Sequence, residues 1–199
     1  TVNDDITAIG TTTARAHAGD SATIRVPSNL KEGDVMFMFI NGSAAGNRKP
    51  SDPSGRGWNK VLEVGPNDLN TKVFYKEYSD GDKKFKVQDG KNTYITIIGL
   101  RGVSSKDPVV NIEATRNSMD GKCGDAVAPK VGTSENGALI VQFLYDDPHL
   151  SFCVDKGVTE LSSFQSGDDG VLTGITSTDG SKYGPIEAAS CSCRRGGGN

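Results

Sequence analysis

The stretch Gly33-Asp-Val-Met-Phe-Met-Phe-Ile40 decides the fold of this chain. The turn signal Gly33-Asp34 leads directly into six consecutive apolar residues, which are too few for a helix and rich in aromatic and branched side chains. Such a run is typical of a strand buried on both faces. We therefore expect residues 34–40 to form the central strand of a hydrophobic core. No nucleophile, metal-binding cluster or phosphate-binding loop lies beside it, so the stretch indicates architecture and not activity.

The composition indicates an all-β domain. The 199 residues include 25 Gly, and 35% are hydrophobic and 24% charged, with Thr, Ser, Asp and Asn spread through the chain. This balance suits many short strands joined by tight turns, and the length is enough for one substantial core. We predict a two-sheet antiparallel β-sandwich, jelly-roll-like, over residues 19–190. An extended N-terminal arm at 1–18 precedes it, and a cysteine- and glycine-containing tail at 191–199 follows.

Short apolar or alternating segments recur along the chain, and turn signals separate nearly all of them. The predicted strands are 21–26, 34–40, 60–64, 72–78, 83–87, 93–98, 108–115, 137–145, 150–154, 158–165, 171–177 and 185–189. This spacing is typical of a two-sheet sandwich. Residues 41–57 are predicted to be a polar loop.

The N-terminal arm alternates with a period of two, which predicts a strand with one buried face. Its small or apolar side includes Val2, Ile6, Ala8, Thr12 and Ala14. Because these side chains are so small, the arm needs a groove made by other segments. Two placements are open: the arm lies along its own sandwich as an edge strand, or it leaves the body and completes the sheet of a neighbouring subunit.

The cysteines favour disulfides over a metal site. No pair has the Cys-x-x-Cys spacing of a zinc knuckle, and only His17 and His149 could supply imidazoles, so we expect no metal and no cofactor. The four cysteines are Cys123, Cys153, Cys191 and Cys193. A Cys191–Cys193 bridge would close a cramped ring, so we expect Cys123 and Cys153 each to hold one tail cysteine. Disulfides imply an oxidising compartment.

Several features favour a secreted, extracellular protein. The chain starts at Thr1 without an initiator Met, and no apolar run is long enough to span a bilayer. Asn41-Gly42-Ser43 is a candidate N-glycosylation sequon, although such short motifs also occur by chance. The net charge of -3 gives no global basic field, so we expect no nucleic-acid partner, and we interpret Lys83-Lys84 as a solvated turn.

The aromatic residues bear on sugar binding. Trp58, the only tryptophan, follows a Pro-Gly turn, where such a residue is more often a core plug than a sugar-stacking platform. The other candidate platforms are Tyr75, Tyr78, Tyr145 and Tyr183. Most of them fall in predicted strands, where the core can use them.

An ordered set of motifs gives the chain a family resemblance over residues 20–190. The set comprises Gly33-Asp-Val-Met-Phe-Met-Phe39, Pro53-Ser-Gly-Arg-Gly-Trp58, Thr71-Lys-Val-Phe-Tyr-Lys-Glu77, Tyr94-Ile-Thr-Ile-Ile-Gly-Leu-Arg-Gly-Val103 with Asp107-Pro-Val109, and Gly137-Ala-Leu-Ile-Val141. This order resembles jelly-roll-like β-sandwich modules of phage tail-associated and bacterial extracellular proteins. The resemblance implies use on particle or cell surfaces, in adhesion, decoration or fibre building. It implies no catalytic residues.

We expect no enzyme, because the chain contains no nucleophile elbow, His-Glu-x-x-His, Walker loop or Rossmann fingerprint. The leading hypothesis is a structural subunit of an extracellular filament or pilus-like surface appendage. Copies of the chain would join head to tail when residues 1–18 add as a strand to the next subunit. The alternative is a carbohydrate-binding or adhesion module, with surface glycans as partners.

Overall fold

The computed structural model describes residues 6–16, 20–43, 49–65, 70–88, 91–109, 111–112, 114, 139–146, 159–166 and 169–177. The chain divides into two compact units, Thr1–Val110 and Asn111–Asn199, where the sequence predicts a single sandwich over 19–190.

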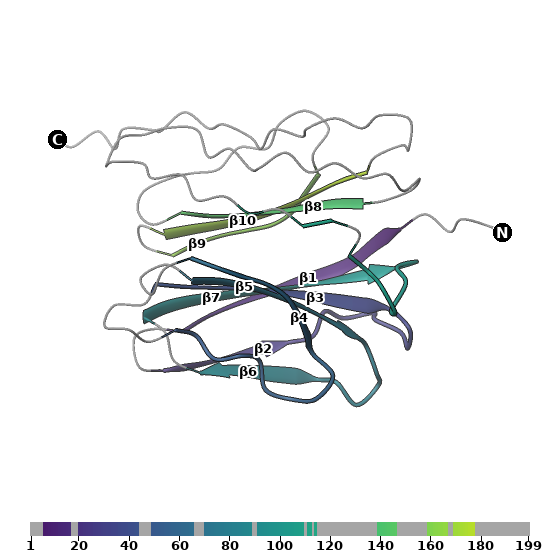
Figure 1. The fold of residues 1–199 in the computed structure, drawn as a ribbon, viewed down its shortest axis with the longest axis horizontal. Helices are drawn as coiled ribbons and strands as arrows, with labels where there is room; N and C mark the ends of the chain where they lie inside the picture. The colour runs from purple at the N-terminus through teal and green to yellow at the C-terminus, as the bar shows by residue number, and fades with distance from the viewer. Residues whose placement is uncertain are drawn as a thin grey trace. The chain divides into compact units, whose positions relative to one another are not determined.

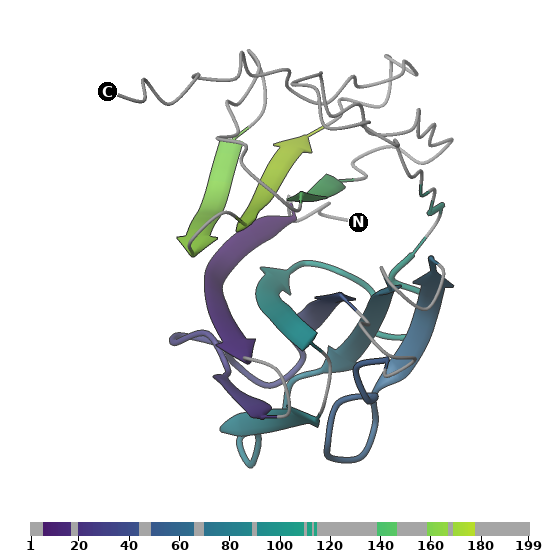
Figure 2. The same cartoon turned by 90° about the vertical axis from the view of Figure 1, so that its left-hand side faces the viewer.

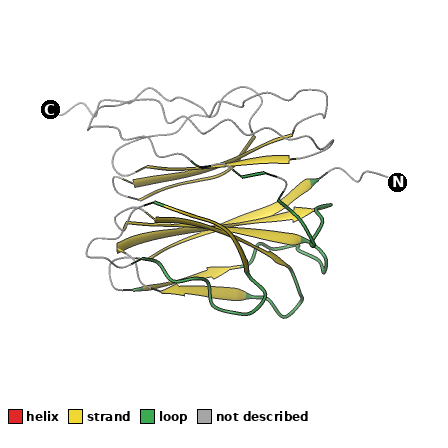
Figure 3. Ribbon diagram, in the orientation of Figure 1, coloured by secondary structure: helices red, strands yellow, loops and turns green. Residues whose placement is uncertain are grey.

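All regular elements among the described residues are β-strands (Figure 3). They are β1 (Thr7–Ala16), β2 (Ser21–Arg25), β3 (Val35–Ser43), β4 (Asn59–Val64), β5 (Asn70–Glu77), β6 (Lys84–Gln88), β7 (Lys91–Arg101), β8 (Leu139–Asp146), β9 (Thr159–Ser166) and β10 (Asp169–Ser177). The all-β prediction is therefore confirmed.

The first unit is a sandwich of two antiparallel sheets (Figure 1). Its larger sheet has the strand order β1-β7-β3-β5-β4, and its smaller sheet pairs β2 with β6. The β2 and β6 strands alternate strictly between exposed and buried residues, because only one face of the small sheet meets the core. The predicted two-sheet sandwich is thus present within this unit.

The core lies between these two sheets. Its buried members are Ala16, Ala22, Ile24, Met36, Met38, Ile40, Phe74, Phe85, Val87, Ile95 and Ile97, each exposed by 4% or less. The central strand β3 is also buried on its second face, where Val35, Phe37 and Phe39 are exposed by at most 9%. The strand predicted from Gly33–Ile40 is therefore central and buried on both sides. Gly33 opens it with a φ of 89°, a conformation that favours glycine.

Two expectations about the loops are wrong. The β3 strand continues to Ser43, so Asn41 lies in the sheet and not in a loop. Residues 108, 109, 111, 112 and 114 are described and form no strand, although 108–115 is predicted as one. Position 108 is a proline, whose missing N–H cannot donate to a ladder.

The second unit contains a three-stranded antiparallel sheet in the order β8-β10-β9. These strands match the predicted segments 137–145, 158–165 and 171–177 closely. On the face of β8 that carries Leu139, Val141 and Phe143, these side chains are partly buried. The predicted strands 150–154 and 185–189 lie outside the described residues.

Candidate functional site

The β1 strand forms one edge of the five-stranded sheet. It pairs antiparallel with β7 from Thr7↔Arg101 to Ala16↔Thr93 and curves along the sheet edge, in purple in Figure 2. In the single chain, residues 7–16 of the predicted arm therefore take the first of the two open placements, an edge strand on their own sandwich. Residues 1–5, including Val2, lie outside the described residues. The candidate site is this strand together with the groove that holds it.

A β-bulge divides β1 into two registers. Ala8 pairs with Leu100, whereas Gly10 pairs with Gly99, so Ile9 is the inserted residue. Paired residues point to the same face of a sheet, and a one-residue shift exchanges the faces. Ala8 therefore points to the opposite face from Thr12 and Ala14. The uninterrupted alternation predicted from the sequence is wrong at this point.

Small residues of β1 fit a narrow space beside the core. Ala14 packs against the core cluster, and Ala16 belongs to it with 3% exposure. Ile6, Ala8 and Thr12 are partly buried. Thr12 Oγ1 donates a hydrogen bond of 2.6 Å to the carbonyl of Arg25 at the end of β2. The groove thus contacts β1 through both sheets.

A pair of glycines sets how closely the loop 26–30 approaches this edge. Gly10 and Gly99 are directly opposed, and a Cβ at Gly10 would lie 3.2 Å from Pro27 Cβ. A Cβ at Gly99 would overlap the side chain of Leu30. The loop therefore packs against the backbone of both strands. A larger residue at position 10 would require Pro27 to shift by a few tenths of an ångström.

The opposite edge of the same sheet, β4, is protected against pairing with another strand. Its pairing with β5 is interrupted by a bulge between Lys60 and Leu62. Lys60 Nζ lies 2.8 Å from Glu63 Oε2, and Lys49 Nζ lies 3.4 Å from Glu63 Oε1. The hydrogen bond from Lys60 lowers the pKa of Glu63 to about 2. Charge and a bulge are two devices that prevent edge-to-edge association.

The outer edge of β6 is covered by a loop. Ser51 and Ser54 donate backbone hydrogen bonds of 2.8 Å to the carbonyls of Gln88 and Lys86. Their hydroxyl oxygens accept from the amides of the same two residues, at 2.8 and 2.7 Å. The buried Lys72 holds this loop by donating to the carbonyl of Pro50 at 2.7 Å. The loop therefore occupies the hydrogen-bonding groups of β6.

The β1 edge also contains a bulge, at Ile9, but it differs from β4 in charge and from β6 in cover. Residues 6–14 contain no charged side chain, and β1 pairs only with β7 in the sheet. Its sequence, Thr7-Ala-Ile-Gly-Thr-Thr-Thr-Ala14, combines β-forming residues with low charge, which is the composition of a strand that pairs readily. Among these three described edges, β1 is therefore the one suited to exchange or addition.

The aromatic candidates are mostly engaged in packing. Trp58 packs edge-on against Phe85, with ring centroids 4.9 Å apart and an interplanar angle of 77°, and it is partly buried against the core cluster. Tyr75 packs beside Phe37 with centroids 6.2 Å apart. Tyr78 also packs against the core and lines a cavity. Tyr145 lies in β8, and Tyr183 lies outside the described residues.

The structure argues against a glycan at Asn41 on the folded chain. Asn41 is 1% exposed, and its Oδ1 accepts a hydrogen bond from Thr71 Oγ1. Transfer of an N-linked glycan requires the amide nitrogen to be accessible, whereas Asn41 Nδ2 is buried. The sequon is therefore part of the sheet and not a surface loop.

The four cysteines lie outside the described residues. The part of the chain that the structure describes contains no cluster of three or more His, Cys, Asp or Glu side chains arranged to hold a metal ion. It also contains no helix with the length and apolarity that crossing a membrane requires.

No family model, no curated protein and no solved structure matches this chain. The resemblance to phage tail and bacterial surface modules therefore stays an expectation.

Proposed function

We propose that this chain is a structural subunit of an extracellular filament or surface appendage, in which the β1 strand of each subunit occupies the β7 groove of the next. The observation that carries the proposal is the difference between the sheet edges. The β4 edge carries ion-paired charges and the β6 edge is covered by a loop, whereas residues 6–14 at the β1 edge are uncharged and mostly small.

Exchange of β1 conserves its contacts. The same pairs with β7 and the same packing of Ala14 and Ala16 form whether the strand comes from its own chain or from another copy. The free-energy difference between the closed monomer and the exchanged polymer then depends on the segment that joins β1 to β2 and on the protein concentration. A donor strand that binds head to tail gives an open polymer unless the rotation closes a ring.

The connection limits the geometry of the polymer. Four residues, 17–20, join β1 to β2. When fully extended they span at most about 14 Å. Donor and acceptor sandwiches must therefore lie close together, and the proposal implies a tightly packed filament instead of beads on a flexible thread. Disulfides among the four cysteines would suit exposure outside the cell.

A cysteine pair across β1 and β7 tests the proposal. Thr13 is exposed and lies directly opposite Thr96 on β7, so the double variant Thr13→Cys/Thr96→Cys places two thiols at a cross-strand pair. If β1 is exchanged, mild oxidation of assembled protein produces a ladder of covalent multimers on non-reducing gels. The wild-type chain, with its native cysteines, and each single variant are the controls.

Electron microscopy of the same samples completes the test. Filaments with a covalent ladder support the proposal. Filaments in which the double variant cross-links only within single chains would show that β1 is not the linker. Dispersed monomers at all concentrations would refute the filament itself.

Carbohydrate binding or adhesion is the second candidate function. The packing of Trp58 against Phe85 argues against the strongest platform predicted from the sequence. The observation that favours the second candidate is a cavity of about 560 Å³ lined in part by Tyr78 and by charged side chains. A glycan screen of wild-type protein tests it.

A further inference from the structure

The outer face of the small β2–β6 sheet carries more positive than negative charge. The exposed residues of the two strands are Ser21, Thr23, Arg25, Lys84, Lys86 and Gln88. Three of these six are cationic and none is acidic, although the chain has a net charge of -3. Lys83 precedes β6 directly. We call Arg25, Lys83, Lys84 and Lys86 the basic face.

The cations of the basic face are placed against one another. Arg25 lies directly opposite Lys84 across the two strands, and Lys86 is two residues further along β6. Like charges in directly opposed positions destabilise a sheet. Within the described part of the chain, Arg25 and Lys84 form no ion pair. By contrast, Lys60, Lys72 and Lys76 each pair with a carboxylate. The fold therefore keeps the like charges of Arg25 and Lys84 next to each other, although it neutralises other lysines with carboxylates.

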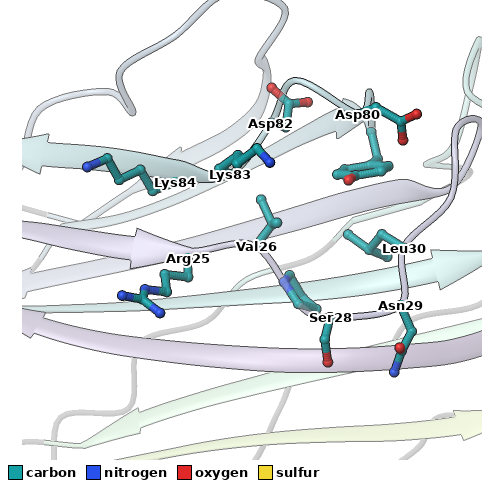
Figure 4. Close-up of a pocket in the computed structure, with 11 residues that line it drawn as sticks. Arg25, Val26, Ser28, Asn29, Leu30, Asp80, Asp82, Lys83 and Lys84 are labelled. Atoms are coloured by element: carbon teal, nitrogen blue, oxygen red, sulfur yellow. The ribbon is translucent and has the colours of Figure 1, made fainter.

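A cavity opens beside the basic face. Its volume is about 560 Å³, within the range of small-molecule sites. Arg25, Lys83 and Lys84 lie on one side of it, as Figure 4 shows. An apolar part of the wall comes from Val26, Pro27, Leu30 and Tyr78.

The carboxylates near the cavity do not cancel this charge. Asp80 and Asp82 are part of the lining, from the turn before β6. Asp82 is already paired with Lys76 at 2.5 Å, and it accepts from the amide of Ser79 at 3.1 Å. Asp80 is exposed and stands alone against the cations of the basic face.

We propose that the basic face binds an anionic polysaccharide, with one carboxylated or sulfated sugar residue seated in the cavity. Guanidinium and ammonium groups form charge-assisted hydrogen bonds to carboxylate and sulfate oxygens. The apolar wall with Tyr78 suits the carbon face of a sugar ring. The alternation of β6 places Lys84 and Lys86 on one line, which suits a linear chain of repeating charge.

This inference rests on the second candidate function, adhesion to glycans, and is independent of the filament. It also differs from nucleic-acid binding. The exposed positions of β2 and β6 include no aromatic side chain, and Tyr78 is the one aromatic ring among the residues that line the cavity. A single strand instead stacks successive bases on several rings, which supply much of its affinity.

The test measures binding of the full chain to polygalacturonate, dextran sulfate, neutral dextran and a single-stranded DNA oligonucleotide. The triple variant Arg25→Gln/Lys84→Gln/Lys86→Gln removes the basic face. The control Lys31→Gln/Arg56→Gln/Lys106→Gln removes the same charge at exposed positions elsewhere. All six positions are exposed, so both variants should fold, and thermal unfolding verifies this.

We expect the wild-type chain and the control variant to bind at least one acidic polysaccharide in low salt. The triple variant should bind about tenfold more weakly, because it loses several charge contacts of modest individual strength. Binding should disappear in about 1 M salt, where the screening length is close to 3 Å.

Three results would overturn the inference: equal losses in the two variants, binding to neutral dextran as strong as to the acidic polymers, or stronger binding to DNA than to either polysaccharide. Filaments that form but bind no polysaccharide would refute this inference and leave the filament proposal standing. Polysaccharide binding by a chain that never polymerises would support this inference and refute the filament proposal.

Discussion

Replacing Asp34 with alanine should destabilise the first unit by more than any single surface change. The Asp34 side chain is 5% exposed, and its carboxylate accepts from Arg101 Nε at 2.8 Å, from Arg101 Nη2 at 2.7 Å and from the amide of Lys31 at 2.8 Å. The hydrogen bond from Arg101 is the main reason why the pKa of Asp34 is lowered. One carboxylate thus joins the end of β7 to the turn that opens β3.

The size of the effect follows from what each partner can do afterwards. A net hydrogen bond to a charged group contributes about 1.5–3 kcal/mol, and a buried donor left unpaired costs about 1–3 kcal/mol. The side chain of Arg101 is 40% exposed and can bind water instead, whereas the amide of Lys31 loses its partner. We therefore expect Asp34→Ala to lower the free energy of unfolding by about 2 kcal/mol, or Tm by roughly 10 °C.

The pH dependence supplies an independent signature. Because the folded pKa of Asp34 lies below its ordinary value of 3.8, ionised Asp34 stabilises the fold above about pH 4 to 5. This contribution is lost as the pH falls through the folded pKa. Urea unfolding of wild type between about pH 6 and pH 3 should therefore show a loss of stability that Asp34→Ala lacks.

An exposed carboxylate gives the matched control. Asp107 is exposed, so Asp107→Ala should change stability by less than about 0.5 kcal/mol. Adding Arg101→Met to Asp34→Ala should then have little further effect, because the pair is already broken. An Asp34→Ala protein as stable as wild type, with the same pH dependence, would refute the reasoning.

Three further changes test the packing and the protected edge. Gly42→Ala would drive a Cβ into the ring of Pro50, so we expect a loss of about 1–3 kcal/mol in urea unfolding, whereas Gly81→Ala, which meets nothing within 4 Å, should be tolerated. Trp58→Ala should cost about 3 kcal/mol because it removes the packing on Phe85, and unchanged stability would reopen Trp58 as a ligand platform. The pKa of Glu63 is about 2 in the folded chain against an ordinary value of 4.5, so ionised Glu63 should stabilise the fold above about pH 5 and lose this effect towards pH 2. Glu63→Gln should therefore flatten this part of the plot of unfolding free energy against pH. Parallel plots for the variant and wild type would contradict the prediction.

Most of the strands could be predicted from the sequence because turn residues and periodicity agree locally. The β2 strand is predicted at 21–26 and found at Ser21–Arg25, and β6 is predicted at 83–87 and found at Lys84–Gln88. The β7 strand is longer than the predicted 93–98, since it pairs with β1 on one side and β3 on the other along Lys91–Arg101. Such extension depends on neighbours that are distant in the sequence.

The features of the candidate site depend on those distant neighbours. The bulge at Ile9 lies where Gly10 meets Gly99. A glycine inside a strand can mark a bulge, but the place of the register shift depends on the pairing with β7. The basic face escapes sequence reasoning for the same reason. Arg25 and Lys84 are separated by more than fifty residues and become neighbours only when β2 pairs with β6. The net charge of -3 therefore gives no sign of the local excess of positive charge on the basic face.

The β1 edge, uncharged over residues 6–14, admits two modes of assembly, and they have different consequences. In exchange, β1 leaves β7 and the neighbour's β1 replaces it, so the close contact between Gly10 and Pro27 forms again between two chains. In simple addition, β1 stays in place and its outer edge accepts any compatible strand, which is a hazard of aggregation. The Thr13→Cys/Thr96→Cys pair separates the two, because addition keeps the cross-link within one chain and exchange does not. We favour exchange because β1 is already fitted to β7 and to the core through its pairing and through Ala14 and Ala16, whereas the described residues contain no strand fitted to the outer edge of β1.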